Sequence, residues 1–180
     1  MIKDIVITIP LVDQLRDVKD RKWKKESCAI CSMKMMMGFS NKKHIEIDIG
    51  QLINEAKKLD GYLEGIGWKH KTISDLAKKY GIKLGFIKKF PKTIKEKSKW
   101  LRKLEDGIIN GKPAMASLHY KLNKKNGGHV VVVNGFRKNG KIVIGYHIQD
   151  PDRNFKGNNY YLSRDKFLLG WRGGMIYFSK

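Results

Sequence analysis

The spacing of apolar and polar residues predicts a helix-rich first half of the chain. Residues 28–37, CAICSMKMMM, are apolar except at Ser32 and Lys34, a pattern typical of a helix buried on most sides. Ser27 is suited to cap the start of this helix, and Gly38 to end it. The same half is expected to contain helices over 49–58, 72–81 and 93–107, and extended segments over 4–12 and 82–90.

From Pro113 onward the pattern changes to short runs rich in β-branched residues, which predict strands. The runs PAMASLH, GHVVVVNGF and KIVIGYHIQD each predict one strand, and GMIYFS predicts another after a short helix in SRDKFLLGW capped by Ser163. Helices followed by antiparallel strands indicate an α+β fold. We expect one domain over 1–180, with a helical lobe over about 1–110, a β lobe over about 111–180 and a cleft between them.

The two central strands predict a hairpin with a two-residue turn at Asn139-Gly140. That turn would place Val132 opposite His147 and, at the open end, His129 opposite Asp150. Directly opposed residues share a face, with Cβ atoms about 4.5–5.5 Å apart. An imidazole beside a carboxylate can be a catalytic pair or a surface ion pair. A one-residue bulge would turn the two side chains to opposite faces.

The chain has two cysteines, Cys28 and Cys31, both in the first predicted helix. At a helix N-terminus the free N–H groups favour a reactive thiolate at Cys28. Three other interpretations are open: two small buried apolar side chains, a redox pair, or half of a zinc site. The redox pair would be expected after a strand, and the five histidines lack paired ligand spacing. A nucleophilic Cys28 needs a base from elsewhere in the fold, which His129 and Asp150 would supply.

The charge raises the possibility of a nucleic-acid-binding protein. There are 38 basic and 17 acidic residues, a formal net charge of +21. The basic residues are mostly lysines spread along the chain, without an RNP-type motif, zinc-finger spacing or basic heptad segment. A solvated basic surface is therefore favoured over a nucleic-acid site.

The N-terminal segment lacks the basic start and long apolar run of a signal peptide. No stretch approaches the roughly 18 uninterrupted apolar residues of a membrane span. We therefore expect a cytoplasmic protein. We also expect it to be a monomer.

Several ordered motifs resemble the C39 type of papain-like cysteine peptidases, which includes bacteriocin-leader-processing peptidases and their free-standing relatives. The matching segments cover nearly the whole chain: SCAICSMKMMM, GIGWKHKTISDLAKKYGI, NGKPAMASL, GGHVVVVNGF, HIQDPD and SRDKFLLGWRGGMIYF. The resemblance implies a papain-like fold and a peptide or protein substrate, for which the charge suggests an acidic one. It implies no metal or cofactor.

Carried over by position, the resemblance makes Cys28 the nucleophile, His129 the general base and then acid, and Asp150 the residue that orients the imidazole. Two features depart from the family pattern: Ala29 follows the cysteine in place of glycine, and no glutamine lies a few residues before it. Gln14 is the candidate oxyanion-hole donor. Without a side-chain donor the Cys28 backbone N–H would act alone, and one missing donor typically costs about 10²–10³ in rate. A catalytically weak or inactive peptide-binding relative is the alternative.

Overall fold

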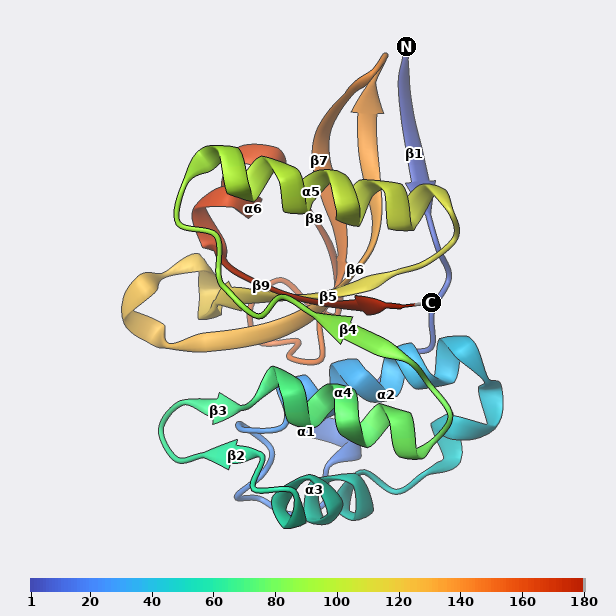
Figure 1. Ribbon diagram of the computed structural model, residues 1–180, viewed down its shortest axis with the longest axis vertical. Helices are drawn as coiled ribbons and strands as arrows, with labels where there is room; N and C mark the ends of the chain where they lie inside the picture. The colour runs from blue at the N-terminus through green and yellow to red at the C-terminus, as the bar shows by residue number, and fades with distance from the viewer. Residues whose placement is uncertain (180) are drawn as a thin grey trace.

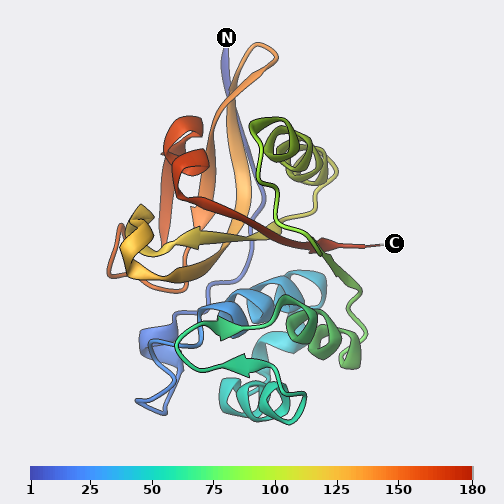
Figure 2. The same cartoon turned by 60° about the vertical axis from the view of Figure 1, so that its left-hand side comes forward.

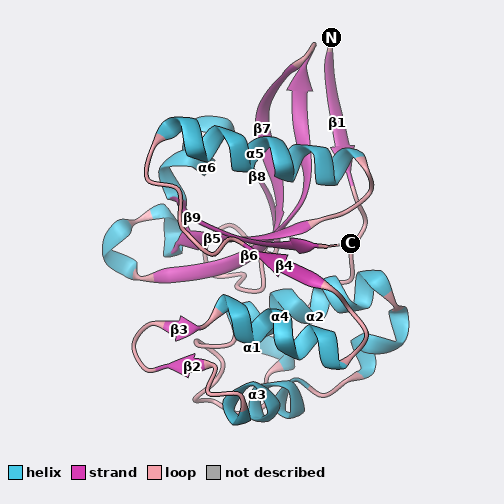
Figure 3. Cartoon of the chain, viewed as in Figure 1, coloured by secondary structure: helices cyan, strands magenta, loops and turns pink. Residues whose placement is uncertain are grey.

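The computed structural model describes residues 1–179 and contains a large antiparallel sheet with helices on both faces (Figures 1 and 3). The helices are α1 (Gln14–Asp17), α2 (Cys28–Ser40), α3 (Ile49–Lys58), α4 (His70–Lys79), α5 (Ile94–Ile109) and α6 (Arg164–Gly170). The strands are β1 (Ile2–Val6), β2 (Tyr62–Leu63), β3 (Gly67–Trp68), β4 (Leu84–Phe86), β5 (Ala114–His119), β6 (Gly128–Asn139), β7 (Ile142–Gln149), β8 (Asn159–Ser163) and β9 (Trp171–Phe178). Short 3₁₀ helices lie at Lys42–Glu46, Tyr120–Leu122 and Lys124–Asn126.

The seven-stranded sheet has the order β4-β9-β5-β6-β7-β8, and β1 also pairs with β6. The first half of β6 pairs with β5, and its second half pairs with β1. Strands β5 and β1 thus lie end to end along the same edge of β6. Figure 2 shows β1, β6 and β7 rising together away from the helical layer. Helices α2, α3 and α4 lie on one side of the sheet, and α5 and α6 lie on the other (Figure 1).

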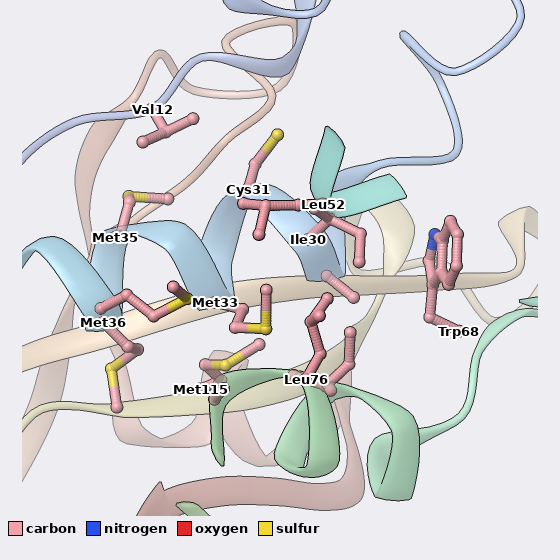
Figure 4. Packing of buried hydrophobic residues seen from close by; sticks show 14 of the residues in the cluster. Val12, Ile30, Cys31, Met33, Met35, Met36, Leu52, Trp68, Leu76 and Met115 are labelled. Carbon is pink, nitrogen blue, oxygen red and sulfur yellow. The ribbon is translucent and has the colours of Figure 1, made fainter. Parts of the chain in front are cut away.

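Helix α2 is the centre of the core on the first side, as its almost wholly apolar sequence predicts. Met33, Met35 and Met36 are fully buried and pack with residues of α3, α4 and the sheet (Figure 4). The polar Ser32 is also buried, and its Oγ donates to the Val130 carbonyl of β6 at 3.0 Å. Because a buried hydroxyl needs a partner, this bond fixes α2 against the strand that carries His129.

The predicted end of α2 is wrong. Gly38 keeps a helical backbone, and the helix continues to Ser40, where the Asn41 N–H bonds back to Met37. A Cβ at position 38 would come within 2.9 Å of Pro10 Cγ, so glycine serves close packing here. Helix α3 has the predicted bounds, whereas α4 starts at His70, two residues earlier than expected. Sequence analysis missed α1, β2, β3 and β8.

The hairpin β6–β7 is confirmed, but its predicted turn and register are wrong. Asn139 pairs with Ile142, which leaves Gly140 and Lys141 as the loop, with Gly140 at φ +58°. Glycine at the first loop position is characteristic of a type II′ turn. Asn139 is held in the sheet because it also pairs with Ile2 of β1.

Two bulges follow, one on each strand of the hairpin. Asn134 is extra on β6 and Ile144 is extra on β7, so their register shifts cancel. The Asn134 bulge is fixed by Ile7, the residue after β1. The Asn134 backbone carbonyl accepts from the Ile7 N–H, and the Asn134 side-chain amide donates to the Ile7 carbonyl.

Because the two bulges cancel, only the move of the turn by one residue affects the pairing at the open end. There Val132 pairs with Gln149, two positions beyond the predicted His147. A shift of two keeps side chains on the same face, so His129 and Asp150 become diagonal neighbours.

Three elements from the first 110 residues lie with the sheet. Strands β1 and β4 are part of it, and α5 packs on its far side with Leu101, Leu104 and Ile108. The helical layer is thus built mainly from residues 14–79, and the sheet side draws on both halves of the chain. That the chain is one domain stays a prediction.

Candidate active site

Cys28 is the first residue of α2 and lies at the end of the helix that faces β6. Ser27 occupies the N-cap position, but its side chain does not cap the helix and instead accepts a 3.7 Å hydrogen bond from Cys31 Sγ. The first-turn N–H groups, including that of Cys28, are therefore not satisfied by a capping side chain. The side chain of Cys28 is partly exposed, whereas Cys31 is fully buried.

The two cysteines differ chemically as a result. Burial raises the pKa of the Cys31 thiol to about 12, so this thiol stays protonated at neutral pH. Figure 4 shows Cys31 among the apolar side chains of the core. Only Cys28 is placed to act as a nucleophile.

His129, the second residue of β6, is bonded to Asp150 directly after β7. The distance from His129 Nε2 to Asp150 Oδ1 is 2.6 Å, and both side chains are buried, at 8% and 1% exposure. Cys28 lines the same cavity as His129 and contributes to the electrostatics of that imidazole. The structure thus brings together the three residues that the sequence analysis selected. Because Nε2 faces Asp150, Nδ1 is the ring nitrogen available to Cys28.

The ionisation of His129 follows from these neighbours. Burial alone would lower the pKa of His129, but the charge of Asp150 and the hydrogen bond to it outweigh burial. Cys28 adds a smaller contribution in the same direction, and the net effect raises the pKa of His129 above its ordinary value of 6.5. At neutral pH the imidazole is therefore held as a cation.

Asp150 is held by groups that sequence analysis missed. Its Oδ1 also accepts from the Asp152 backbone N–H at 2.8 Å, and its Oδ2 accepts from the Tyr160 hydroxyl at 2.7 Å. The Asp150 backbone is bonded in both directions to Asn158. Tyr160 lies on β8, a strand that the sequence did not predict, so no local signal marked it.

A second tyrosine, Tyr120, packs against His129. The ring of Tyr120 makes an edge contact with the imidazole, with centroids 5.4 Å apart, and its hydroxyl donates to Asp152 Oδ2 at 3.0 Å. Tyr120 thereby shields the buried His129–Asp150 pair, and a shielded ion pair is weakened less by water.

Gln14 begins α1 and is brought to the same region by its backbone. Its N–H donates to the carbonyl of Pro151, the residue after Asp150, at 2.9 Å, and the Asp13 carboxylate caps the short helix. The intervening loop returns toward α1, where Lys24 Nζ donates to the Leu15 carbonyl. Gln14 is 1% exposed, and within residues 1–179 its Oε1 has no hydrogen-bond partner.

Two adjoining cavities open at His129. One, of about 420 Å³, is lined by Cys28 and His129, and the other, of about 700 Å³, is lined by Gln14, Tyr120 and His129. The residues that line both are Lys25, Glu26, Ile66, Gly128 and His129. The two cavities therefore adjoin at His129, and together they are called the groove below.

Trp68 supports the groove as a packing residue. Its ring packs at a tilt against those of Trp23 and Tyr62, and its Nε1 donates to the Glu26 carbonyl at 2.7 Å, which fixes the loop before Cys28. In the described part of the chain, no group of three or more His, Cys, Asp or Glu side chains is arranged to bind a metal ion. No helix among residues 1–179 is both long and apolar enough to cross a bilayer.

Residues 6–173 match the family described as Peptidase_C39 like family. The chain belongs to this family. A search of the curated proteins finds no match. The resemblance inferred from the short motifs is therefore confirmed for the family over almost the whole chain.

Solved structures show that the fold is that of C39-like peptidase domains. A protein from Bacillus anthracis described as a C39-like peptidase is 17% identical, with a TM-score of 0.67, covering 99% of this chain and 98% of its own. A double glycine motif protease from an AMS/PCAT transporter, solved in complex with a leader peptide, is 17% identical at TM-score 0.57, covering 97% and 94%. The peptidase domain of Streptococcus ComA is 19% identical at TM-score 0.56, covering 87% and 93%. The predicted α+β fold of the C39-like type is confirmed.

Proposed function

We propose that this C39-like chain is a cysteine peptidase that hydrolyses peptide bonds through Cys28, His129 and Asp150. The observation that carries the proposal is the buried 2.6 Å bond between His129 and Asp150, with Cys28 beside the same imidazole at a helix N-terminus. A carboxylate that holds an imidazolium next to a thiol favours the thiolate, which is the nucleophilic form.

The catalytic cycle follows from the positions of these groups. Cys28 Sγ attacks the scissile carbonyl carbon, and the resulting oxyanion accepts hydrogen bonds from the Cys28 N–H and the Gln14 side-chain amide. His129 Nδ1–H then protonates the leaving amine, which releases the first product and leaves a thioester on Cys28. His129, now neutral, takes a proton from water, and the hydroxide formed attacks the thioester to free the second product. Asp150 keeps the ring oriented and stabilises its cationic form.

A peptide-binding relative without catalysis is the second candidate. The observation that favours it is that Gln14 and Cys28 line adjoining cavities and share no single one. This candidate predicts that the groove retains peptides without cleaving them.

A proteome-derived peptide library separates the two candidates. We expect wild type to generate new termini, identified by mass spectrometry, and Cys28→Ser to generate none. Cys31→Ala is the matched control, because it removes the buried thiol and should keep cleaving. Peptide retention without cleavage by the wild type would favour the binding protein.

A further inference from the structure

The cavity beside Cys28 carries a marked excess of positive charge. Its basic lining residues are Lys25, Lys69, Lys71, Lys88 and Arg172, and Glu26 is the one carboxylate among the described lining residues. Two of these cations are neutralised locally, because Lys69 pairs with Asp60 at 2.8 Å and Lys71 with Asp75 at 2.5 Å. The other three form no ion pair within residues 1–179.

Among the three cations without an ion pair in the described residues, Arg172 lies against the strand carrying His129. It is the second residue of β9, and its guanidinium lies over Gly128, the residue before His129. A Cβ at position 128 would collide with Arg172 Nη1, so the missing side chain makes room for the guanidinium. This places a positive charge in the groove, beside the residue that precedes the histidine on β6.

The two histidines near Arg172 carry no charge of their own at neutral pH. Burial, reinforced by the charge of Arg172, lowers the pKa of His70 and of His119, so both imidazoles are neutral at pH 7. His70 also lines the cavity, and its Nδ1 is buried without a hydrogen-bond partner in the described part of the chain. This end of the groove thus contains polar groups that the protein itself leaves unpaired.

The rim of the same cavity is apolar. Leu63, Ile66 and Phe90 are 38%, 71% and 55% exposed, and all three line it. A guanidinium beside apolar side chains is weakly hydrated, and it binds carboxylates in a bidentate manner more strongly than an ammonium does. The combination suits the side chain of an aspartate or glutamate flanked by other peptide residues.

We propose that Arg172 is a specificity-determining residue that selects peptides with an acidic side chain within a few residues of the scissile bond. This inference rests on the proposed peptidase function and names its substrate class. Nucleic-acid phosphates would also suit an arginine. The peptide is favoured because the cavity of about 420 Å³ is partly apolar and contains Cys28 and His129.

The test compares cleavage of one peptide library by wild type, Arg172→Glu and Arg102→Glu. Arg102 is exposed on α5, on the opposite side of the sheet from the groove, and gives the same change in net charge. We expect wild-type cleavage sites to be enriched in Asp or Glu at one fixed position. Arg172→Glu should lose that enrichment at least tenfold, and Arg102→Glu should keep it. Arg172→Gln, which only removes the charge, should give the same loss, with circular dichroism reporting the fold of each variant.

Cleavage without acidic enrichment, or enrichment equal in Arg172→Glu and Arg102→Glu, would overturn the inference and leave the peptidase standing. If wild type cleaves nothing, the peptidase proposal fails, and immobilised Cys28→Ser then tests the groove by capture. Acidic peptides retained by Cys28→Ser and released by Cys28→Ser/Arg172→Glu would support the acidic subsite, whereas equal retention would overturn it. Arg172-dependent binding of a single-stranded DNA oligonucleotide in preference to acidic peptides would also overturn it.

Discussion

Gln14 is positioned by the same turn that carries Asp150. Its N–H is bonded to Pro151, and its buried side chain reaches the groove where His129 lies. Fourteen positions separate Gln14 from Cys28 in the sequence, so their relation depends on long-range contacts. The backbone bond and the burial of the residue restrict where the side-chain amide can lie, and an oxyanion donor must be positioned in advance.

Gln14→Ala tests this role. We expect kcat to fall about 10²–10³-fold, with KM nearly unchanged, because the lost hydrogen bond forms mainly in the transition state. Steady-state kinetics on a cleaved library peptide provide the measurement. A kcat within a factor of about two of wild type would assign the oxyanion to backbone groups alone.

Asp150→Asn tests the electrostatic role of the carboxylate. Because the folded-state pKa of His129 is raised, the folded protein binds this proton more tightly than the unfolded chain does. This contribution to stability is fully present below the unfolded value of about 6.5 and is lost as the pH rises through the folded value. Without the Asp150 charge, burial dominates and the pKa of His129 falls, so the imidazole is neutral at pH 7.

An NMR titration of the His129 ring protons measures that shift. The midpoint of Asp150→Asn should lie at a clearly lower pH than that of wild type. A midpoint shared by both proteins would mean that Asp150 does not control the charge of His129.

Cys28, His129 and Asp150 could be selected from local signals: a helix start, a hairpin and a strand end. Tyr160 and Asn158 could not, since they contact Asp150 through β8, whose pairing with β7 left no recognisable pattern. Nor did the Ser27 side chain cap α2 as its residue type suggested, because it accepts from Cys31 instead.

At the scale of elements, the hairpin shows why local turn chemistry was insufficient. The Asn139-Gly140 dipeptide favoured one register, but Asn139 pairs with both β1 and β7, and the loop moved by one residue. The bulge at Asn134 is likewise set by contacts with Ile7. His129 and Asp150 still meet because the net shift at the open end is two residues, which preserves the face.

The bond between α2 and β6 should contribute measurably to stability. Ser32→Ala removes the hydrogen bond to the Val130 carbonyl, and we expect the free energy of unfolding to fall by about 0.5–1.5 kcal/mol. Ser40→Ala, at the exposed end of the same helix, is the control and should change it little. Urea denaturation of both variants gives the comparison. Equal stability of the two would indicate that the Ser32 bond contributes nothing.

At the scale of the whole molecule, strands from both ends of the chain complete one sheet. β1 pairs with β6 across more than a hundred residues, and β4 pairs with β9. Such pairings have no local sequence pattern. The sequence therefore predicted a boundary between a helical lobe and a β lobe near residue 110, whereas β1, β4 and α5 lie with the sheet. The fold class, by contrast, follows from apolar periodicity alone.

The net charge of +21 should act on substrates over long distances. Raising the salt concentration from 0.1 to 1 M shortens the Debye length from about 10 Å to about 3 Å. We therefore expect kcat/KM for a glutamate-containing peptide to fall about tenfold or more, and kcat/KM for its glutamine counterpart to change little. The test is to measure kcat/KM for both peptides at the two salt concentrations. Equal salt dependence of both peptides would argue against electrostatic attraction of acidic substrates.

The central claim is that protonated His129 activates Cys28, and the pH dependence of iodoacetamide alkylation tests it most directly. A Cys31→Ala background leaves one thiol to follow. In that background we predict rapid alkylation that persists below pH 7, and a loss of this reactivity at low pH in His129→Ala. If both proteins instead show the same profile, with a midpoint near that of free cysteine, about 8.5, the proposed pair does not exist.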